Sequence, residues 1–391
     1  MNYILFDGDL RNALLPFTYT RPFADIRIGI LTLRDKWEKH LGLTTSTITE
    51  EYLEDKYPMV ELEENILINA SFIPTKKLID KLKALTKNQA IFQGEERIAF
   101  FTSDTQEEVD FDSYEHIEYE DDLIQIKNTC DIFSFNEQAI QADFELITDG
   151  KKSQPIPEGV QAIHKENIFI EEGATVLFSS LNASDGPIYI GKGAEIMEGC
   201  LVRGPFAMCD HSVLKMGAKV YGATTLGPYC KVGGEVSNSV LFGYSNKGHE
   251  GFLGNSVIGE WCNLGADTNT SNLKNNYAEV KLWNYQANKF TKTGLQFCGL
   301  MMGDHSKCGI NTMFNTGTVV GVSTNIFGSG FPRNFIPSFS WGGASGFTSY
   351  QLKKVFEVTK VVMERRGIEF SEKEKQILEY IFKETSTNRN Y

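Results

Sequence analysis

The sequence lacks long apolar runs and any excess of positive charge. Among its 391 residues, 38 Lys and Arg stand against 51 Asp and Glu, so the net charge is -13. No run approaches the roughly 18 apolar residues that a membrane-spanning helix needs. A net negative charge also disfavours binding to nucleic acid or to an anionic membrane surface. We therefore expect neither a membrane nor a nucleic acid among its partners.

Cysteine is scarce and unpaired in the sequence. The seven cysteines form no Cys-x-x-Cys motif, which disfavours both a zinc centre and a disulfide framework. The first residues also lack the basic segment and cleavage site of a signal peptide. These absences predict a cytoplasmic protein with reduced, buried thiols.

What the sequence does contain is a six-residue periodicity. Counting by sixes from Ile190 to Val232 meets only apolar residues, with glycines frequent between them. A helix repeats at about 3.6 residues and a strand at 2, so neither explains this spacing. Coils with three short faces explain it, because each six-residue segment then points one apolar side chain inward. After an interruption the pattern returns at Met302, Cys308, Phe314, Val320 and Ile326.

The length of the chain predicts more than one domain. We expect an α/β domain over 1–150, a β-helix over 156–345 and C-terminal helices over 346–391. The capping-box pattern of Ser371 and Glu374 predicts the start of the last helix, and these helices are expected to close the end of the coil.

Local patterns divide the first domain into strands and helices. Tyr3–Phe6 and Glu61–Ala70 read as strands, whereas Ile28–His40 and Leu78–Leu85 have the spacing of helices. This alternation is typical of an α/β fold.

The beginning of the chain resembles the sugar-phosphate nucleotidyltransferases. Pro16-Phe17-Thr18 and Arg21-Pro22 match the later part of that family's first loop, whose glycine-rich part is reduced here to Gly8 and Arg11. The resemblance implies a reduced nucleotidyltransferase-like domain in which Arg11, Arg21 and Lys36 clamp phosphate. The alternative is that these cations pair with acidic side chains.

The same resemblance implies a possible Mg²⁺ site in this domain. Asn69 follows the strand-like residues Ile66–Ile68, where the family has a metal-binding aspartate. A neutral amide is a weak ligand by itself, so Asp131 is the second candidate ligand.

The interruption of the six-residue pattern carries a more specific motif. Asn246–Gly254, Ile258–Asp267 and Thr268–Asn275 resemble the acetyltransferase half of the bifunctional N-acetylglucosamine-1-phosphate uridyltransferase/glucosamine-1-phosphate acetyltransferase family. The resemblance implies a left-handed β-helix, a homotrimer and acetyl-CoA as donor. It also implies an amino-sugar 1-phosphate acceptor, with glucosamine 1-phosphate first, and a possible coupled uridylyl transfer that gives UDP-N-acetylglucosamine.

Carried over by position, the motif assigns roles to single residues. His249 becomes the general base, since imidazole titrates near neutral pH and an amine must lose a proton before it attacks a thioester. Asn263 orients the amine or the acetyl carbonyl, and Asn272 holds the sugar. Phe252 and Leu273 stand where the family has tyrosines, so the acceptor can differ.

The phosphate and the acyl donor need further partners. Lys247 and Arg203 are candidates for binding the phosphate of the sugar. His305 lies where the family's coil meets the donor, although a lone histidine there is more often a corner residue than a catalyst. The residues expected to contact the acyl donor are Ala266, His305, Ser306 and Arg333.

Three functions stay open at this point. The first is an amino-sugar acetyltransferase with a reduced nucleotidyltransferase-like domain. The second is a catalytically inactive homologue that acts as a scaffold or as a sensor of sugar nucleotides. The third is a nucleotidyltransferase whose coil serves only for trimerisation. The His249 motif favours the first.

Overall fold

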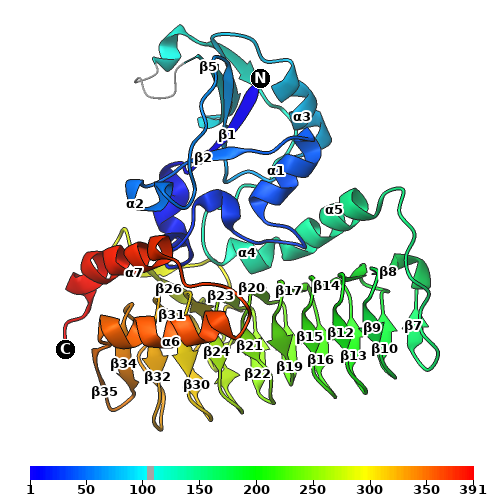
Figure 1. Ribbon diagram of the computed structural model, residues 1–391, viewed down its shortest axis with the longest axis vertical. Coiled ribbons are helices and arrows are strands. Elements are labelled where there is room, and N and C mark those ends of the chain that lie inside the picture. Colours follow the sequence, from blue (N-terminus) through cyan, green and yellow to red (C-terminus); the bar gives the residue numbers. More distant parts are fainter. Residues whose placement is uncertain (104–109) are drawn as a thin grey trace. The chain divides into compact units, whose positions relative to one another are not determined.

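The computed structural model describes residues 1–103 and 110–391, which divide into two units (Figure 1). The first unit comprises Met1–Leu14, Thr20–Ile26 and Leu31–Asn128 within the described residues, and the second comprises Leu15–Tyr19, Arg27–Ile30 and Thr129–Tyr391. The chain therefore changes unit several times before residue 31.

The first unit is built on a mixed sheet with the strand order β2-β1-β3-β5-β4-β6. β1 pairs in parallel with β2 and β3, whereas β5 runs antiparallel to both β3 and β4. The strands of this sheet are β1 (Asn2–Phe6), β2 (Ser46–Ile48), β3 (Asn65–Asn69), β4 (Gln89–Gln93), β5 (Glu96–Thr102) and β6 (Glu115–Glu118).

Short helices connect these strands. Thr32 and Asp35 form a capping box at the start of the first α-helix, and Gly42 ends it in the left-handed conformation. The helices are η1 (Asp9–Leu14), η2 (Phe17–Tyr19), η3 (Phe23–Asp25), α1 (Leu33–Leu41), α2 (Glu51–Glu54), α3 (Lys76–Lys83) and η4 (Phe111–Ser113). The predicted strands and the second helix are confirmed; the first helix begins at Leu33 rather than Ile28, because the Thr32 cap fixes its start.

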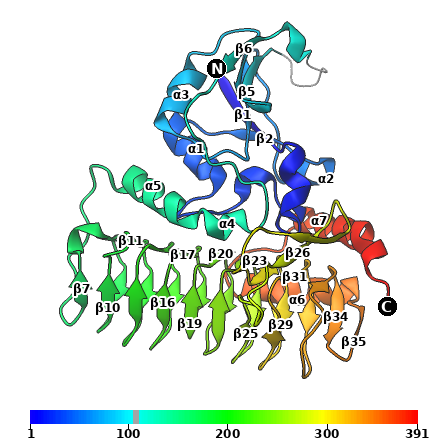
Figure 2. The ribbon, with the colours of Figure 1, turned by 180° about the vertical axis from the view of Figure 1, so that it is seen from behind.

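The second unit is a parallel β-helix with three faces (Figures 1 and 2). Face 1 contains β7 (Gln161–Ile163), β10 (Ser180–Asn182), β13 (Leu201–Arg203), β16 (Lys219–Tyr221), β19 (Glu235–Ser237) and β22 (Phe252–Gly254). Face 2 contains β8 (Ile168–Ile170), β11 (Ile188–Ile190), β14 (Phe206–Met208), β17 (Thr224–Leu226), β20 (Val240–Gly243), β23 (Val257–Glu260), β28 (Leu300–Met302), β31 (Thr318–Val320) and β33 (Phe335–Ile336). Face 3 contains β9 (Thr175–Val176), β12 (Glu195–Ile196), β15 (Val213–Leu214), β18 (Lys231–Val232), β21 (Asn246–Lys247), β24 (Asn263–Leu264), β29 (Lys307–Cys308), β32 (Asn325–Ile326), β34 (Ser340–Gly343) and β35 (Gly346–Ser349).

The predicted six-residue pattern forms the core of these coils. The inward side chains from Ile190 to Val232 are at most 3% exposed, and they belong to one continuous apolar cluster. Each coil buries its apolar side chains only against the neighbouring coils, as expected for a repeat architecture. The β-helix prediction is confirmed.

The interruption of the pattern is a local excursion from the coil. After β25 (Asn269–Thr270) the chain forms an antiparallel hairpin of β26 (Lys281–Asn284) and β27 (Lys289–Lys292), and β25 itself pairs in parallel with β30 (Met313–Phe314), which lies beyond the hairpin. The coil resumes at Leu300.

The first of the two compact units ends at Asn128. The helices α4 (Asp131–Ser134) and α5 (Asn136–Thr148) belong to the second unit because side-chain hydrogen bonds attach α5 to a strand of face 2. Asn136 Nδ2 donates to Ala223 O at 3.0 Å and to Thr225 Oγ1 at 3.1 Å. Its Oδ1 accepts from Gly29 N at 2.7 Å. Polar side chains thus attach α5 to the coil.

The C-terminal helices follow the last hairpin of the coil, whose strand β35 extends to Ser349. They are α6 (Leu352–Glu364), α7 (Glu372–Glu384) and η6 (Thr385–Asn388), and η5 (Lys165–Asn167) lies between the first two coil strands. Ser371 and Glu374 form the predicted capping box. All seven cysteines are buried and free, as expected. Within the described ranges, no helix has the length and apolar character needed to cross a membrane.

A ladder of aromatic side chains follows one corner of the coil. His211, Tyr229, Tyr244, Trp261 and His305 all adopt positive φ, from 54° to 62°. Successive ring centroids lie 5.0, 5.1, 4.2 and 6.3 Å apart. Positive φ is unfavourable for bulky residues, and the stacking of each ring on the next offsets this cost.

Candidate functional site

His249 lies in the segment between β21 and β22, and its side chain is exposed. Backbone hydrogen bonds hold the segment on both sides of the residue. Asp267 N donates to Glu250 O at 2.9 Å, and Gly251 packs so closely on Thr268 that a Cβ atom there would lie 2.2 Å from Thr268 O. The main chain is therefore fixed while the imidazole is presented to solvent.

Lys247 supports this segment from inside the coil. Its side chain is 1% exposed, and Nζ donates to Gly233 O and to His249 O, both at 2.9 Å. Burial lowers the pKa of Lys247 to about 8, and the nearby Glu250 opposes this shift. The sequence predicts Lys247 as a ligand of the substrate; its observed hydrogen bonds go to two backbone carbonyls, one at Gly233 in the preceding coil and one at His249.

Phe252 and Asn272 lie beside each other over Gly254. A Cβ atom on Gly254 would lie 2.5 Å from the Phe252 ring and 2.7 Å from Asn272 Nδ2. Asn272 Nδ2 also donates to Asn255 Oδ1 at 2.8 Å. Two predicted substrate-binding residues are thus adjacent, and a Cβ atom on Gly254 would require their side chains to shift.

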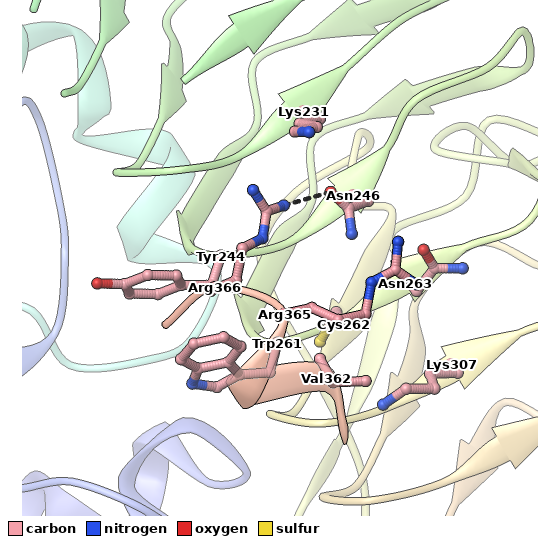
Figure 3. A pocket seen from close by; sticks show the side chains of 10 residues that line it. All are labelled: Lys231, Tyr244, Asn246, Trp261, Cys262, Asn263, Lys307, Val362, Arg365 and Arg366. Carbon is pink, nitrogen blue, oxygen red and sulfur yellow. Dashed lines mark hydrogen bonds between the residues drawn. The ribbon is translucent and has the colours of Figure 1, made fainter. Parts of the chain in front are cut away.

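Asn263 lies on face 3, in a row of polar side chains that share one register. Lys231 pairs with Asn246, Asn246 with Asn263, and Asn263 with Lys307. The row borders a cavity of about 490 Å³ between face 3 and the end of α6 (Figure 3). The residues that line this cavity are Lys231, Tyr244, Asn246, Trp261, Cys262, Asn263, Lys307, Val362, Arg365 and Arg366.

Three of the residues predicted to contact the acyl donor lie in or near the coils that contain Asn263. Each of them makes a contact within the protein. Ser306 is fully buried, with its hydroxyl donating to Gly321 O at 2.6 Å. Ala266 O accepts from Asn311 N at 2.8 Å. His305 ends the aromatic ladder beside Trp261.

The two remaining predicted anion-binding arginines lie in other hollows. Arg203 pairs with Asp185 at 3.2 Å and lines a hollow on face 1 together with Lys219. Arg333 lines a hollow beside the β26–β27 hairpin, and its guanidinium lies 5.6 Å from the centroid of the Phe347 ring.

The predicted phosphate clamp of the first unit consists of buried cations. Arg11, Arg21 and Lys36 are only 6%, 4% and 2% exposed. Arg11 Nε donates to Asp7 at 3.0 Å and Nη2 to Tyr52 at 2.9 Å. Desolvation by burial raises the pKa of Asp7, against the opposing effect of Arg11. In this conformation Arg11 is held by protein groups, which corresponds to the ion-pair alternative.

The predicted Mg²⁺ ligands have protein partners too. Asn69 Oδ1 accepts from Ser71 N at 3.1 Å and from Ser71 Oγ at 2.8 Å. Asp131 belongs to the second unit, at the start of α4. Over the described ranges, no group of three or more His, Cys, Asp or Glu side chains is placed to hold a metal ion. These residues do not fit a Mg²⁺ site as they stand.

Sequence reasoning missed the cations of the cavity. Lys231 and Lys307 each immediately precede an inward apolar position of the six-residue pattern, so the pattern itself could have placed them on one face of the coil. Arg365 and Arg366 carried no such signal, since nothing in the sequence shows which coil the end of α6 meets.

Comparison with known proteins finds a matching family model and several similar proteins. Residues 3–152 match the family model described as "Sugar nucleotidyl transferase". A "Bifunctional protein GlmU" from Cyanothece sp. is 24% identical over 193 residues, covering 44% of this chain and 42% of that protein. Another, from Thermus thermophilus, is 32% identical over 140 residues, covering 29% of this chain and 30% of that protein. The chain thus spans less than half the length of these relatives.

The solved structures to which this chain is similar include LpxA, a UDP-N-acetylglucosamine acyltransferase from Bacteroides fragilis. It is 11% identical, covers 58% of this chain and 96% of its own, and has a TM-score of 0.25.

Proposed function

From its relation to the bifunctional GlmU proteins, we propose that the chain transfers an acetyl group from acetyl-CoA to the amine of an amino-sugar 1-phosphate. Glucosamine 1-phosphate is the first candidate acceptor. The chain acts in the cytoplasm, on the route to a UDP-N-acetylglucosamine type of product.

The observation that carries this proposal is the His249 segment. Its backbone is fixed by Lys247 and by the next coil, yet the imidazole is exposed, and no described residue forms a hydrogen bond with the ring. A structural histidine would normally use its ring in the fold. A general base must instead present a free nitrogen to its substrate.

Besides a general base, acetyl transfer needs only residues that align the acceptor with the donor. His249 takes a proton from the sugar's ammonium group, the amine then attacks the thioester carbonyl, and a new C–N bond replaces the C–S bond. The departing thiolate takes up the proton that the nitrogen loses as the amide forms, and His249 releases the first proton to solvent. Asn263, Asn272 and Phe252 align the acceptor, and such alignment is itself worth several kcal/mol.

We predict that acetyl transfer exceeds uridylyl transfer by a wide margin. In-line phosphoryl transfer needs Mg²⁺ and free cations around the triphosphate, whereas Arg11, Arg21 and Lys36 are buried. The assay supplies glucosamine 1-phosphate, acetyl-CoA and UTP, and follows CoA and pyrophosphate release separately. Robust pyrophosphate release without CoA release would contradict the proposal and favour the nucleotidyltransferase alternative.

We also predict a homotrimer. Apolar side chains stand exposed along the coil of one subunit, among them Phe178, Met216 and Ile310 at 68%, 68% and 69%. Exposed apolar surface of this kind favours association. Light scattering at micromolar concentration measures the mass; a fully active monomer would reject this prediction.

One observation favours a second role for the first unit. Its cations are engaged inside the protein, so a scaffold that binds a sugar nucleotide weakly or not at all is consistent with this arrangement. Saturable binding of UTP to the intact chain, measured by calorimetry, would speak against the scaffold.

A further inference from the structure

The cavity between face 3 and the end of α6 gathers four cationic side chains. Lys231 and Lys307 come from the coil, and Arg365 and Arg366 come from the C-terminal end of α6 (Figure 3). None of the residues that line it carries a carboxylate, and none of the four cations forms an ion pair with a described residue. The positive charge is therefore not compensated locally.

Hydrogen bonds account for only part of this cluster. Arg366 Nη2 donates to Asn246 Oδ1 at 3.1 Å, and Lys307 Nζ donates to His305 O at 2.9 Å. The negative end of the α6 dipole favours cations in this place, but it concerns the two arginines alone. Neither the two hydrogen bonds nor the helix dipole explains why two lysines of the coil line the same cavity as the arginines.

The lowered pKa values of the two lysines are consistent with this excess of positive charge. The pKa of Lys231 is lowered by desolvation first and then by the charges of Arg366, Lys215 and Arg365. Burial lowers the pKa of Lys307 to about 8. An anion in the cavity would relieve both costs.

The dimensions indicate an anion larger than a single phosphate. Lys231 and Lys307 are three strand spacings apart along face 3, or about 14 Å at roughly 4.8 Å per spacing. Between them, Asn246 and Asn263 supply amide groups. The volume of about 490 Å³ matches a small-molecule site.

An apolar wall lies beside the cations. Tyr244 and Trp261 stack with their ring centroids 4.2 Å apart, and both line the cavity, on the side away from Lys307 in the view of Figure 3. A ligand with a charged middle and a less polar end fits such a site.

We propose that this cavity binds an organic diphosphate ester, with Arg365, Arg366, Lys231 and Lys307 around the phosphates. A nucleoside-diphosphate sugar and coenzyme A share this chemistry, and the test below distinguishes them. Asn263 belongs both to this cavity and to the acceptor site of the proposed function, whereas the four cations and His249 do not share a role.

The test is calorimetric titration of the full chain with inorganic pyrophosphate. We expect Arg366→Gln and Lys307→Gln each to weaken binding about tenfold or more, equivalent to about 1.4 kcal/mol or more. Arg366→Lys retains the charge and should keep most of the affinity. Lys353→Gln is the matched control, since Lys353 is exposed on the same helix, and its affinity should equal that of the wild type. Circular dichroism of each variant checks that it folds.

Competition then identifies the ester. Displacement of pyrophosphate by UDP-N-acetylglucosamine or by CoA, in either case, supports the proposal and names the source of the ligand. The His249→Ala variant should bind pyrophosphate normally even if it transfers no acetyl group, which separates the two proposals. No binding of pyrophosphate, equal losses in Arg366→Gln and Lys353→Gln, or no displacement by either ester would overturn the proposal.

Discussion

Replacing His249 with alanine is expected to lower the acetyl-transfer rate by about 10²–10⁴-fold while leaving the coil folded. Proton removal by a positioned base is typically worth this factor, or roughly 3–5 kcal/mol of barrier. The exposed imidazole contributes nothing to the apolar core, so the thermal midpoint should hardly move. The turnover number and the melting curve of the same preparation measure both effects.

His305 provides the comparison for this experiment. It is half-buried at the end of the aromatic ladder, so His305→Ala should lower stability more than His249→Ala does and turnover less. Normal turnover in His249→Ala together with loss in His305→Ala would move the assignment to His305. If neither substitution alters turnover and acetyl-CoA does not bind, the acetyltransferase proposal fails.

Gly227→Ala is expected to destabilise the β-helix severely. A Cβ atom at Gly227 would lie 1.9 Å from Phe242 O and 2.6 Å from Leu241 O. Both atoms are backbone in the neighbouring coil, so no side chain can rotate away. Overpacking usually costs about 1–3 kcal/mol and occasionally more, and we expect a loss on the order of 3 kcal/mol or greater in the free energy of unfolding, measured by denaturant titration.

Gly309→Ala is the matched control in the same β-helix. The atoms nearest to its added Cβ, in Phe327 and Ile326, lie 3.6 Å or more away, an ordinary contact distance, and its φ is not positive. Its stability should stay close to that of the wild type. Equal stability of the two variants would mean that the coil spacing at Gly227 is wrong.

The β-helix could be predicted because its inward-facing positions recur at a fixed spacing along the chain. An inward position recurs every six residues, and a polar side chain there would be costly. Apolar residues therefore recur at this spacing from Ile190 to Val232, where the pattern is visible in the sequence. The helix-capping signal at Ser371 is equally local. Such features depend on neighbours in the chain, and these are visible in one sequence.

The unpredicted features depend on contacts between distant residues. Asn136 looks like an ordinary helix residue, yet its bonds to Ala223 and Thr225 place α5 on the coil. The aromatic ladder was missed because its members occupy corners where glycine or asparagine is usual. For the candidate site, the motif around His249 predicted a general base and Lys247 as a substrate ligand, but it could not reveal that Lys247 turns inward.

Two early segments, Leu15–Tyr19 and Arg27–Ile30, belong to the second unit, and this limits where the chain can be cut. Arg27 Nε donates to Phe242 O at 2.9 Å, Thr225 Oγ1 donates to Gly29 O at 2.9 Å, and the Phe17 ring lies 5.2 Å from that of Phe242. A fragment that begins at Thr129 would lose all three contacts and expose an apolar ring. No single cut therefore yields an intact β-helix, and genetic recombination at one junction could not exchange this β-helix for another without also replacing residues near the N-terminus.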